Sequence, residues 1–394
     1  MRRSCVALGM LCLVAAPLAA ALAADDEKPK APEVRWTDVR ELGVEGQGWT
    51  DTKAPFDRLP GRAEGVVRPP VWGLSRQSAG LCVRFATDSP TIQARWTLTS
   101  NNLALPHMPA TGVSGLDLYV QTDHGYRWLG AGRPEKAGEN TATLIAGLPR
   151  SRREYLLYLP LYNGVKAVSL GVPEGFAIEK APPRGGDRSR PIVFYGTSIT
   201  QGGCASRPGM VHTAILGRRL DRAIINLGFS GNGRMEPEMA KLLAELDPVV
   251  YVLDCLPNMN AAEVAERVEP FVKTLRAAHP DTPIVLADDR SYSNASIVAG
   301  SQRHNAANRA ALRQARENLE RAGVKGCSAS GRRPARLRTA RDRRRLAPHR
   351  PRLSPHGRCL RAGAPPGARP PGREALGRHA SKPLTTFPAT SVRR

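Results

Sequence analysis

The 394-residue sequence lacks any long hydrophobic run apart from one near its N-terminus. The apolar stretch at 5–22 is short and rich in alanine, and no later stretch is long enough to cross a bilayer as a helix. We therefore expect no membrane span. Arg2 and Arg3 before this stretch and the small residues at 21–23 predict a secretory signal peptide over residues 1–23. The mature protein would then be periplasmic or extracellular.

Cysteine is sparse, and its spacing argues against two classes of protein. Two of the seven cysteines lie in the predicted signal peptide, and no two of the others have Cys-x-x-Cys spacing. This argues against a zinc site and against a scaffold built on many disulfides, although one bridge stays open. The cysteines of the mature chain are Cys82, Cys204, Cys255, Cys327 and Cys359.

Acidic and aromatic residues nearly disappear after residue 327. Residues 328–394 contain 17 Arg and one Lys against Asp342 and Glu374, so this tail carries +16 of the total net charge of +23. Its Arg/Pro/Gly/Ala composition has no apolar periodicity, which predicts disorder. Phe387 is its one aromatic ring for stacking on bases, and we expect no nucleic-acid partner for an exported protein. Electrostatic binding of the tail to an anionic surface stays open.

Two regions between these ends differ in their periodicity. Residues 34–180 alternate apolar and polar residues over short stretches separated by turns, which predicts an all-β sandwich or jelly-roll domain. Residues 182–186 are typical of a linker. Over residues 188–327, apolar strands alternate with helices, which predicts an α/β domain with a parallel sheet. We expect strands at 192–195, 223–227, 249–253 and 283–287, and helices at 208–220, 235–246, 261–278 and 301–322.

Ser198 is the first candidate for chemistry. The strand at 192–195 runs directly into Gly196-Thr197-Ser198, and α/β enzymes place reactive side chains at the carboxyl ends of parallel strands. A serine nucleophile for acyl transfer fits this position. The alternative for this residue taken alone is a serine that caps the following turn.

Three blocks of the sequence follow the ends of expected strands. They are Tyr195-Gly196-Thr197-Ser198, Asn226-Leu227-Gly228-Phe229-Ser230-Gly231-Asn232-Gly233 and Leu253-Asp254-Cys255-Leu256-Pro257-Asn258. Together they resemble the SGNH (GDSL-type) hydrolases, which are esterases with a flavodoxin-like core. The resemblance covers about 190–326. It implies that Ser198 is the nucleophile, and that the Ser198 N–H, the Gly231 N–H and the Asn258 side-chain amide form an oxyanion hole. It implies no metal or organic cofactor.

The third block departs from the family pattern. Pro257 stands where the family usually has Gly, and Met259 stands where it usually has Asp. Asn258 has the alternative role of satisfying backbone groups of its loop. Close approach of the backbone would explain a glycine at position 231, whereas Gly228 and Gly233 are expected to be turn glycines.

Three further residues near the predicted strand ends are given structural interpretations. Cys204 is expected to be a small packed residue and not a second nucleophile. Asp288 and Asp289 follow an expected strand, where a carboxylate could line the site. A solvated loop or a helix cap is the interpretation that we favour for both.

The sequence contains no general base in the expected place. The family resemblance implies Asp-x-x-His near the C-terminus, and no such pattern follows residue 327. His349, His356 and His379 lie in the arginine-rich tail without that context. His212 and His304 lie on expected helices, where surface or packing roles are favoured.

A shift of reading frame near Cys327 would explain this loss. The corresponding block of the family commonly reads Asp-Gly-Ser-His-Pro-Thr-Asp-Leu-Gly-Phe. GC-rich codons for it, read two bases late, encode Leu-Ala-Pro-His-Arg-Pro-Arg-Leu, which is identical to residues 346–353. We therefore hypothesise that the tail is translated out of frame and that His349 is not a catalytic histidine.

These observations predict a secreted serine esterase of the SGNH type that acts on acyl esters. Secreted acetylxylan esterases have a similar layout, with a β-sandwich before an SGNH core, so by analogy the expected substrate is an O-acetylated polysaccharide or another acyl carbohydrate. The missing histidine predicts little or no activity. The alternative is a non-catalytic carbohydrate-binding protein with a relic hydrolase core.

Overall fold

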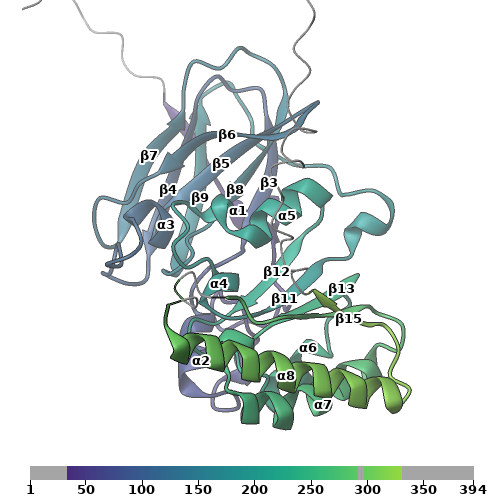
Figure 1. Ribbon diagram of the computed structural model, residues 1–394. Coiled ribbons are helices and arrows are strands. Elements are labelled where there is room, and N and C mark those ends of the chain that lie inside the picture. Colours follow the sequence, from purple (N-terminus) through teal and green to yellow (C-terminus); the bar gives the residue numbers. More distant parts are fainter. Residues whose placement is uncertain (1–32, 292–293, 295–296, 331–394) are drawn as a thin grey trace, which may run out of the picture. The chain divides into compact units, whose positions relative to one another are not determined.

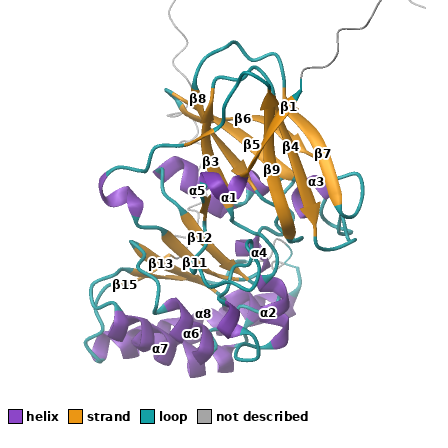
Figure 2. Cartoon of the chain, turned by 180° about the vertical axis from the view of Figure 1, so that it is seen from behind, coloured by secondary structure: helices purple, strands orange, loops and turns teal. Residues whose placement is uncertain are grey.

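The computed structural model describes residues 33–291, 294 and 297–330 (Figure 1). The predicted signal peptide and residues 331–394 lie outside the described residues. The described chain forms an antiparallel sandwich and a parallel sheet flanked by helices (Figure 2), which confirms the predicted fold class. None of the described helices is long and apolar enough to cross a membrane.

Two antiparallel sheets face each other in the sandwich. One sheet has the strand order β1-β9-β4-β7 and the other has the order β10-β3-β8-β5-β6, with β2 paired to β3. Strands β3, β4 and β8 bury Phe85, Trp96 and Tyr155 in the shared core. Alternate residues point inward, as burial along β4 shows. The strands are β1 (Val34–Asp38), β2 (Val44–Glu45), β3 (Cys82–Thr87), β4 (Ile92–Leu98), β5 (Leu116–Thr122), β6 (Gly125–Gly132), β7 (Glu139–Ile145), β8 (Arg153–Tyr158), β9 (Val165–Pro173) and β10 (Glu179–Lys180).

The second sheet has five strands, all parallel, in the order β12-β11-β13-β14-β15. Numbered from its own first strand, this is the 2-1-3-4-5 order of flavodoxin-like folds. The order reverses beside β11, so the carboxyl end of β11 is where such folds bind ligands. The strands are β11 (Ile192–Gly196), β12 (Ile224–Gly228), β13 (Val250–Asp254), β14 (Ile284–Ala287) and β15 (Cys327–Ser330).

Both faces of this sheet are covered, as the apolar strands require. Val193 and Tyr195 of β11 pack with residues of α6, α7 and α8 in one cluster. Ile192 and Phe194 point to the opposite face and pack with Leu216 of α5. The helices are α4 (Ser198–Gln201), α5 (His212–Leu220), α6 (Pro237–Leu243), α7 (Ala261–Ala278) and α8 (Ala299–Arg321), with single turns η2 (Gly186–Ser189), η3 (Pro208–Met210) and η4 (Leu256–Asn258).

An irregular segment before β3 packs on the α/β sheet, although it lies inside the predicted sandwich region 34–180. Trp49, Leu59 and Val71 are buried in the same cluster as Tyr195 of β11. Helix α2 (Pro69–Ser75) carries Val71 into this cluster. Sequence reasoning missed this packing, because the apolar residues of this segment do not follow a strand period. The remaining short elements are α1 (Val39–Leu42), η1 (Gly61–Ala63) and α3 (Ala110–Val113).

The structure corrects the predicted start of the tail. Residues 328–330 are not disordered but form the end of β15, in which Ala287 of β14 lies opposite Ser330. Main-chain hydrogen bonding explains this strand, because Cys-Ser-Ala-Ser offers little apolar surface and lies at the sheet edge.

The expected linker at 182–186 is anchored. Arg184 pairs with Glu45 of β2 at 2.6 Å and with Asp221 after α5 at 3.3 Å. Its side chain is almost fully buried, so the connection joins sandwich and α/β domain at a fixed point.

Candidate active site

Ser198 is the first residue of α4 and directly follows β11 and the N-cap residue Thr197. The Thr197 hydroxyl accepts a hydrogen bond from the Ile199 N–H at 3.2 Å, so Thr197 caps the turn. Ser198 is half-buried, and its carbonyl accepts from the Gly203 N–H at 2.7 Å. The capping alternative therefore applies to Thr197, which leaves the Ser198 hydroxyl without a capping role.

Ser198, Gly231 and Asn258 follow three neighbouring strands. Gly196 at the end of β11 lies opposite Gly228 of β12 on one side and Asp254 of β13 on the other. Because the three strands are parallel, the loops that leave them lie at the same edge of the sheet. The structure therefore brings the three predicted site residues to one edge.

The Asn258 side chain binds the loop that carries Gly231. Its hydrogen-bond network orients the amide so that Oδ1 accepts from the N–H groups of Asn232 at 3.0 Å and Gly233 at 3.2 Å. The loop-satisfying role and the oxyanion role are thus compatible, because binding through Oδ1 leaves Nδ2 as the donor of the amide. Met259, where the family usually has Asp, is buried in the apolar core.

The glycines of the second block have different reasons for being glycine. Gly231 is exposed and has φ +71°, and a Cβ added there would have no heavy atom within 4 Å, so its backbone conformation and not crowding by the protein favours glycine. Gly228 and Gly233 are not simple turn glycines. A Cβ on Gly228 would lie 2.1 Å from the Gln201 nitrogen, and one on Gly233 would lie 2.0 Å from the Gly196 carbonyl oxygen. The second block is therefore packed tightly against the first.

Arg58, which no sequence motif singled out, binds the end of β12, the strand that leads into this loop. Its guanidinium is fully buried and donates to the carbonyl oxygens of Asn226 at 2.9 Å and Gly228 at 2.8 Å. It also donates to Leu74 and Gln77. Burial lowers the pKa of Arg58 to about 9, so it remains a cation at neutral pH.

Arg68 binds Asn232 in the loop that carries Gly231. It donates to Asn232 through both the side-chain Oδ1 at 2.9 Å and the main-chain oxygen at 2.8 Å. It also pairs with the buried Glu236 at 2.5 Å. The second Glu236 oxygen accepts from the Tyr195 hydroxyl at 2.9 Å, which ties Arg68 back to β11. The Asn232 N–H donates to Asn258, so Arg68 is linked to the third block through Asn232.

Gln201 links the helix of Ser198 to the second block. Its Oε1 accepts from the Ser230 N–H at 2.9 Å, and its Nε2 donates to Gln77 at 2.5 Å and to the Leu161 carbonyl at 3.2 Å. The side chain is fully buried. Its place three residues after Ser198 was the one sequence signal that could have marked it.

Two carboxylates lie near the ends of β13 and β14, of which Asp289 is buried and Asp254 is half-buried. The structure corrects the expectation for Asp289, which is 3% exposed and accepts hydrogen bonds from Asn305 at 2.6 Å and Asn308 at 3.3 Å. Helix α8 supplies both amides, which explains why a residue after a strand is not solvated. Asp254 accepts from the Thr200 hydroxyl at 3.2 Å. Burial, with a further contribution from the charge of Asp289, raises the pKa of Asp254 to about 6.

No histidine among the described residues hydrogen-bonds to the Ser198 hydroxyl. His212 begins α5 and packs edge-on against Phe194, and burial lowers its pKa. His304 is exposed on α8 and contacts Asn308. His349, His356 and His379 lie outside the described residues.

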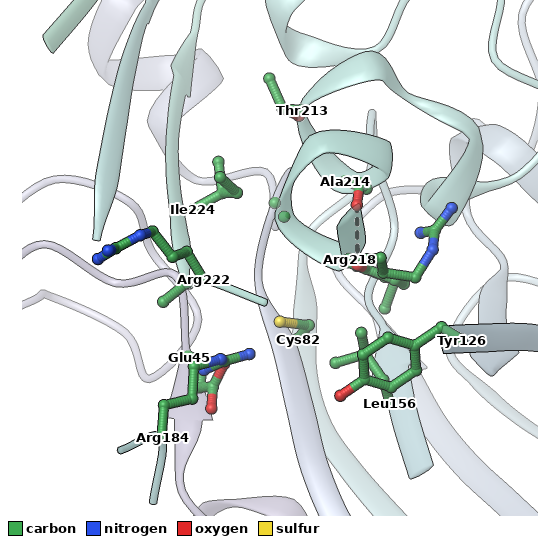
Figure 3. Close-up of a pocket in the computed structure, with 14 residues that line it drawn as sticks. Glu45, Cys82, Tyr126, Leu156, Arg184, Thr213, Ala214, Arg218, Arg222 and Ile224 are labelled. Carbon is green, nitrogen blue, oxygen red and sulfur yellow. Dashed lines mark hydrogen bonds and ion pairs between the residues drawn. The ribbon is translucent and has the colours of Figure 1, made fainter. Parts of the chain in front are cut away.

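The described cysteines form no disulfide, and one of them departs from its expected environment. The sequence predicted that Cys204 is a small packed residue. In the structure it is exposed and lies in the loop after α4 with φ +66°. Cys82, Cys204, Cys255 and Cys327 are all free thiols. Cys82 lines a cavity of about 20 Å³ between β3 and α5, room for one water molecule, together with Leu156 and Arg218 (Figure 3). Burial raises the pKa of this thiol, and none of the three site residues lines this cavity.

Comparisons with known proteins agree with this geometry. Residues 189–330 match a family described as the GDSL-like lipase/acylhydrolase family, and residues 34–178 match the GxDLY family, described as the N-terminus of SGNH hydrolase-type esterases. A crystal structure described as a GDSL-like lipase from Bacteroides ovatus is 34% identical, with a TM-score of 0.71 over 75% of this chain and 86% of that one. The chain belongs to the SGNH (GDSL-like) hydrolase family. Membership of this family makes it a hydrolase that acts on esters.

Two further solved structures are similar to this SGNH protein at lower sequence identity. A salicylyl-acyltransferase from a tetracycline biosynthetic pathway is 21% identical, with a TM-score of 0.61 over 75% of this chain and 84% of that one. A family two carbohydrate esterase from Cellvibrio japonicus is 11% identical, with a TM-score of 0.49 over 76% of this chain and 88% of that one. A comparison with curated proteins finds no significant match.

Proposed function

We propose that Ser198 is the nucleophile of a serine esterase and that the Ser198 N–H, the Gly231 N–H and Asn258 Nδ2 stabilise the oxyanion. The observation that carries the proposal is the shared sheet edge. Ser198 begins a helix there, and the Asn258 amide is held through its oxygen by the loop of Gly231. Donors fixed in advance around a developing negative charge are the main catalytic device in acyl transfer.

The reaction requires proton transfers that these residues do not provide. The Ser198 oxygen bonds to the ester carbonyl carbon, and the carbonyl electrons move onto the oxygen that the donors face. The bond to the alcohol then breaks, and the alcohol takes up the proton that left the serine. A base must carry that proton, and water repeats the sequence to release the acid.

We propose that the 394-residue chain is impaired because that base was lost through a reading-frame shift near Cys327. The absence of Asp-x-x-His after residue 327 and the eight-residue identity at 346–353 support this proposal. Resequencing of the locus tests it directly. A single intact frame confirmed from 328 to 394 would contradict the frameshift.

Acetyl esters of carbohydrates are the proposed substrates, and export by the signal peptide the proposed route to them. Support for the substrate comes from analogy with secreted esterases in which a sandwich precedes the SGNH core. The second candidate function is non-catalytic binding of carbohydrate, which the missing base favours.

Covalent labelling with a fluorophosphonate distinguishes the two functions. An intact but slow site is expected to label at Ser198, and Ser198→Ala is expected to abolish the label, as peptide mapping by mass spectrometry would show. Glycan pull-down without any label on Ser198 would favour the binding protein.

A further inference from the structure

The sequence Gly115-Leu116-Asp117-Leu118-Tyr119 lies at the start of β5 in the sandwich. Leu116 and Leu118 point into the sandwich core. Because side chains alternate along a strand, Asp117 and Tyr119 point to the opposite face, where Tyr119 packs with Val211 of the α/β domain. We propose that Asp117 is a positioning residue that fixes the segment following the nucleophile. The proposal rests on Ser198 being that nucleophile.

Asp117 is fully buried, and its carboxylate receives four hydrogen bonds. Two come from its own sheet, from Trp128 Nε1 at 2.8 Å and the Tyr119 hydroxyl at 3.3 Å. Two come from the α/β domain, from the Gly209 N–H at 2.9 Å and Arg207 Nε at 3.2 Å. A buried charge is stable only when it is paired and hydrogen-bonded, so Asp117 and the 207–209 segment depend on each other.

Tyr119 adds a steric constraint at the same point. A Cβ on Gly209 would lie 2.4 Å from Cε2 of the Tyr119 ring, so a side chain at position 209 does not fit beside this ring. The Arg207 guanidinium lies 4.6 Å from the centre of the Trp128 ring, and the Arg218 guanidinium lies 4.0 Å from that of Tyr119. Asp117 and Tyr119 of β5 thus both contact residues 207–209, which precede α5.

Residues 207–209 belong to the stretch of chain that continues from the nucleophile helix. This stretch runs from α4 through Cys204, whose φ of +66° is unfavourable for a residue with a side chain, to the turn η3. The sandwich touches it at two more points. The Thr111 hydroxyl donates to the Ser206 carbonyl at 2.7 Å, and the Tyr162 hydroxyl donates to the Ser198 carbonyl at 3.3 Å.

These contacts explain how an unfavourable backbone persists next to Ser198. A strained loop keeps one conformation only when surrounding contacts over-determine it. Asp117 provides the one charged contact in this set that binds both the backbone and a side chain of the segment. Without it, we expect the loop and the short helix α4 to sample other conformations, with Ser198 out of line with its oxyanion donors.

Asp117→Asn and Asp123→Asn form a matched pair for the test. Both remove one carboxylate charge from the same hairpin, but Asp123 is exposed at the β5–β6 turn. Two measurements on the full-length protein are needed. One is amide hydrogen exchange of peptides that cover 198–211, and the other is the saturating rate of Ser198 phosphonylation by a fluorophosphonate. Arg207→Gln, a milder change at a partly exposed side chain, serves if Asp117→Asn fails to fold.

Asp117→Asn is expected to raise exchange in 198–211 at least tenfold while β11 and β13 stay protected. It is also expected to lower the saturating labelling rate at least tenfold, with little change in the reagent concentration at half-saturation. Asp123→Asn should change neither. Exchange in 198–211 within threefold of the parent protein would overturn the proposal. If the parent protein never labels at Ser198, the proposed nucleophile fails, and the exchange measurement still decides the role of Asp117.

Discussion

The guanidinium of Arg58 donates a 2.8 Å hydrogen bond to the carbonyl oxygen of Gly228, at the strand end from which the proposed oxyanion loop departs. The two residues are 170 positions apart in the sequence. Arg58 lies after β1 and β2 and before all the other strands of the sandwich, yet its partners include carbonyl groups of the α/β sheet. The N-terminal region is therefore part of the support of the site and not a separable binding module.

Replacing Arg58 is expected to destabilise the fold. Arg58→Met removes the donors to four carbonyl oxygens, and we expect a loss of about 3 kcal/mol in the free energy of unfolding. Urea denaturation measures it. The matched control is Arg133→Met at an exposed site, expected to stay within about 0.5 kcal/mol of the parent protein. Equal effects of the two substitutions would contradict the support role.

The glycines of the second block should differ in their tolerance of alanine. Gly231→Ala places a methyl group in open space at φ +71°, so we expect a cost of about 1 kcal/mol. Gly233→Ala forces a methyl group against the Gly196 carbonyl oxygen, and we expect poor folding or a cost of several-fold more. Thermal denaturation of both variants measures the order. A Gly233→Ala protein as stable as Gly231→Ala would show that the two blocks are not in contact.

Asn258→Asp separates the two roles of this side chain. A carboxylate still accepts from the Asn232 and Gly233 N–H groups, but at neutral pH it cannot donate to an oxyanion. We expect near-normal stability and a loss of about 10²–10³-fold in the rate of Ser198 acylation or phosphonylation. Asn101→Asp at an exposed position is the control. An unchanged rate in Asn258→Asp would remove Asn258 from the oxyanion hole.

Stability should depend on the ionisation of Asp254. Its pKa is raised from the ordinary 3.8 to about 6, so between these values the folded chain holds a proton that the unfolded chain has lost. Unfolding then releases a proton, and stability falls as pH rises through this window. Asp254→Asn retains an acceptor for Thr200 and removes the charge. The difference in the free energy of unfolding, variant minus parent protein, should therefore be roughly 1 to 2 kcal/mol larger at pH 8 than at pH 5. Urea denaturation at both pH values checks this, and an equal difference at the two would refute it.

The sequence predicts what depends on local pattern. The predicted helix at 261–278 has these same bounds in the structure, and the alternation of strands and helices predicted a parallel sheet. Ser198 could be found because a strand, a glycine and a serine lie close together in the sequence.

Long-range contacts explain what the sequence did not reveal. Asp117 reads as one polar residue in an alternating strand, and only the fold shows the loop it binds. Arg58 reads as a surface residue, and its burial depends on carbonyl groups contributed by β12. Asp289 was expected in solvent because the amides that cover it lie on α8, beyond the next loop. Strand β15 has almost no apolar signal, and its pairing with β14 and the packing of Cys327 on the apolar cluster place it at the sheet edge.

The most direct test of the account compares hydrolysis of p-nitrophenyl acetate by three proteins. They are the 394-residue chain, its Ser198→Ala variant, and a chain whose reading frame is restored after residue 327. We expect the 394-residue chain to stay close to Ser198→Ala and the restored chain to be faster by about 10³-fold or more, because removing the base of a serine–histidine pair costs several orders of magnitude. Turnover by the 394-residue chain at the level of the restored one, abolished by Ser198→Ala, would contradict the claim that this chain has kept its oxyanion site and lost its base.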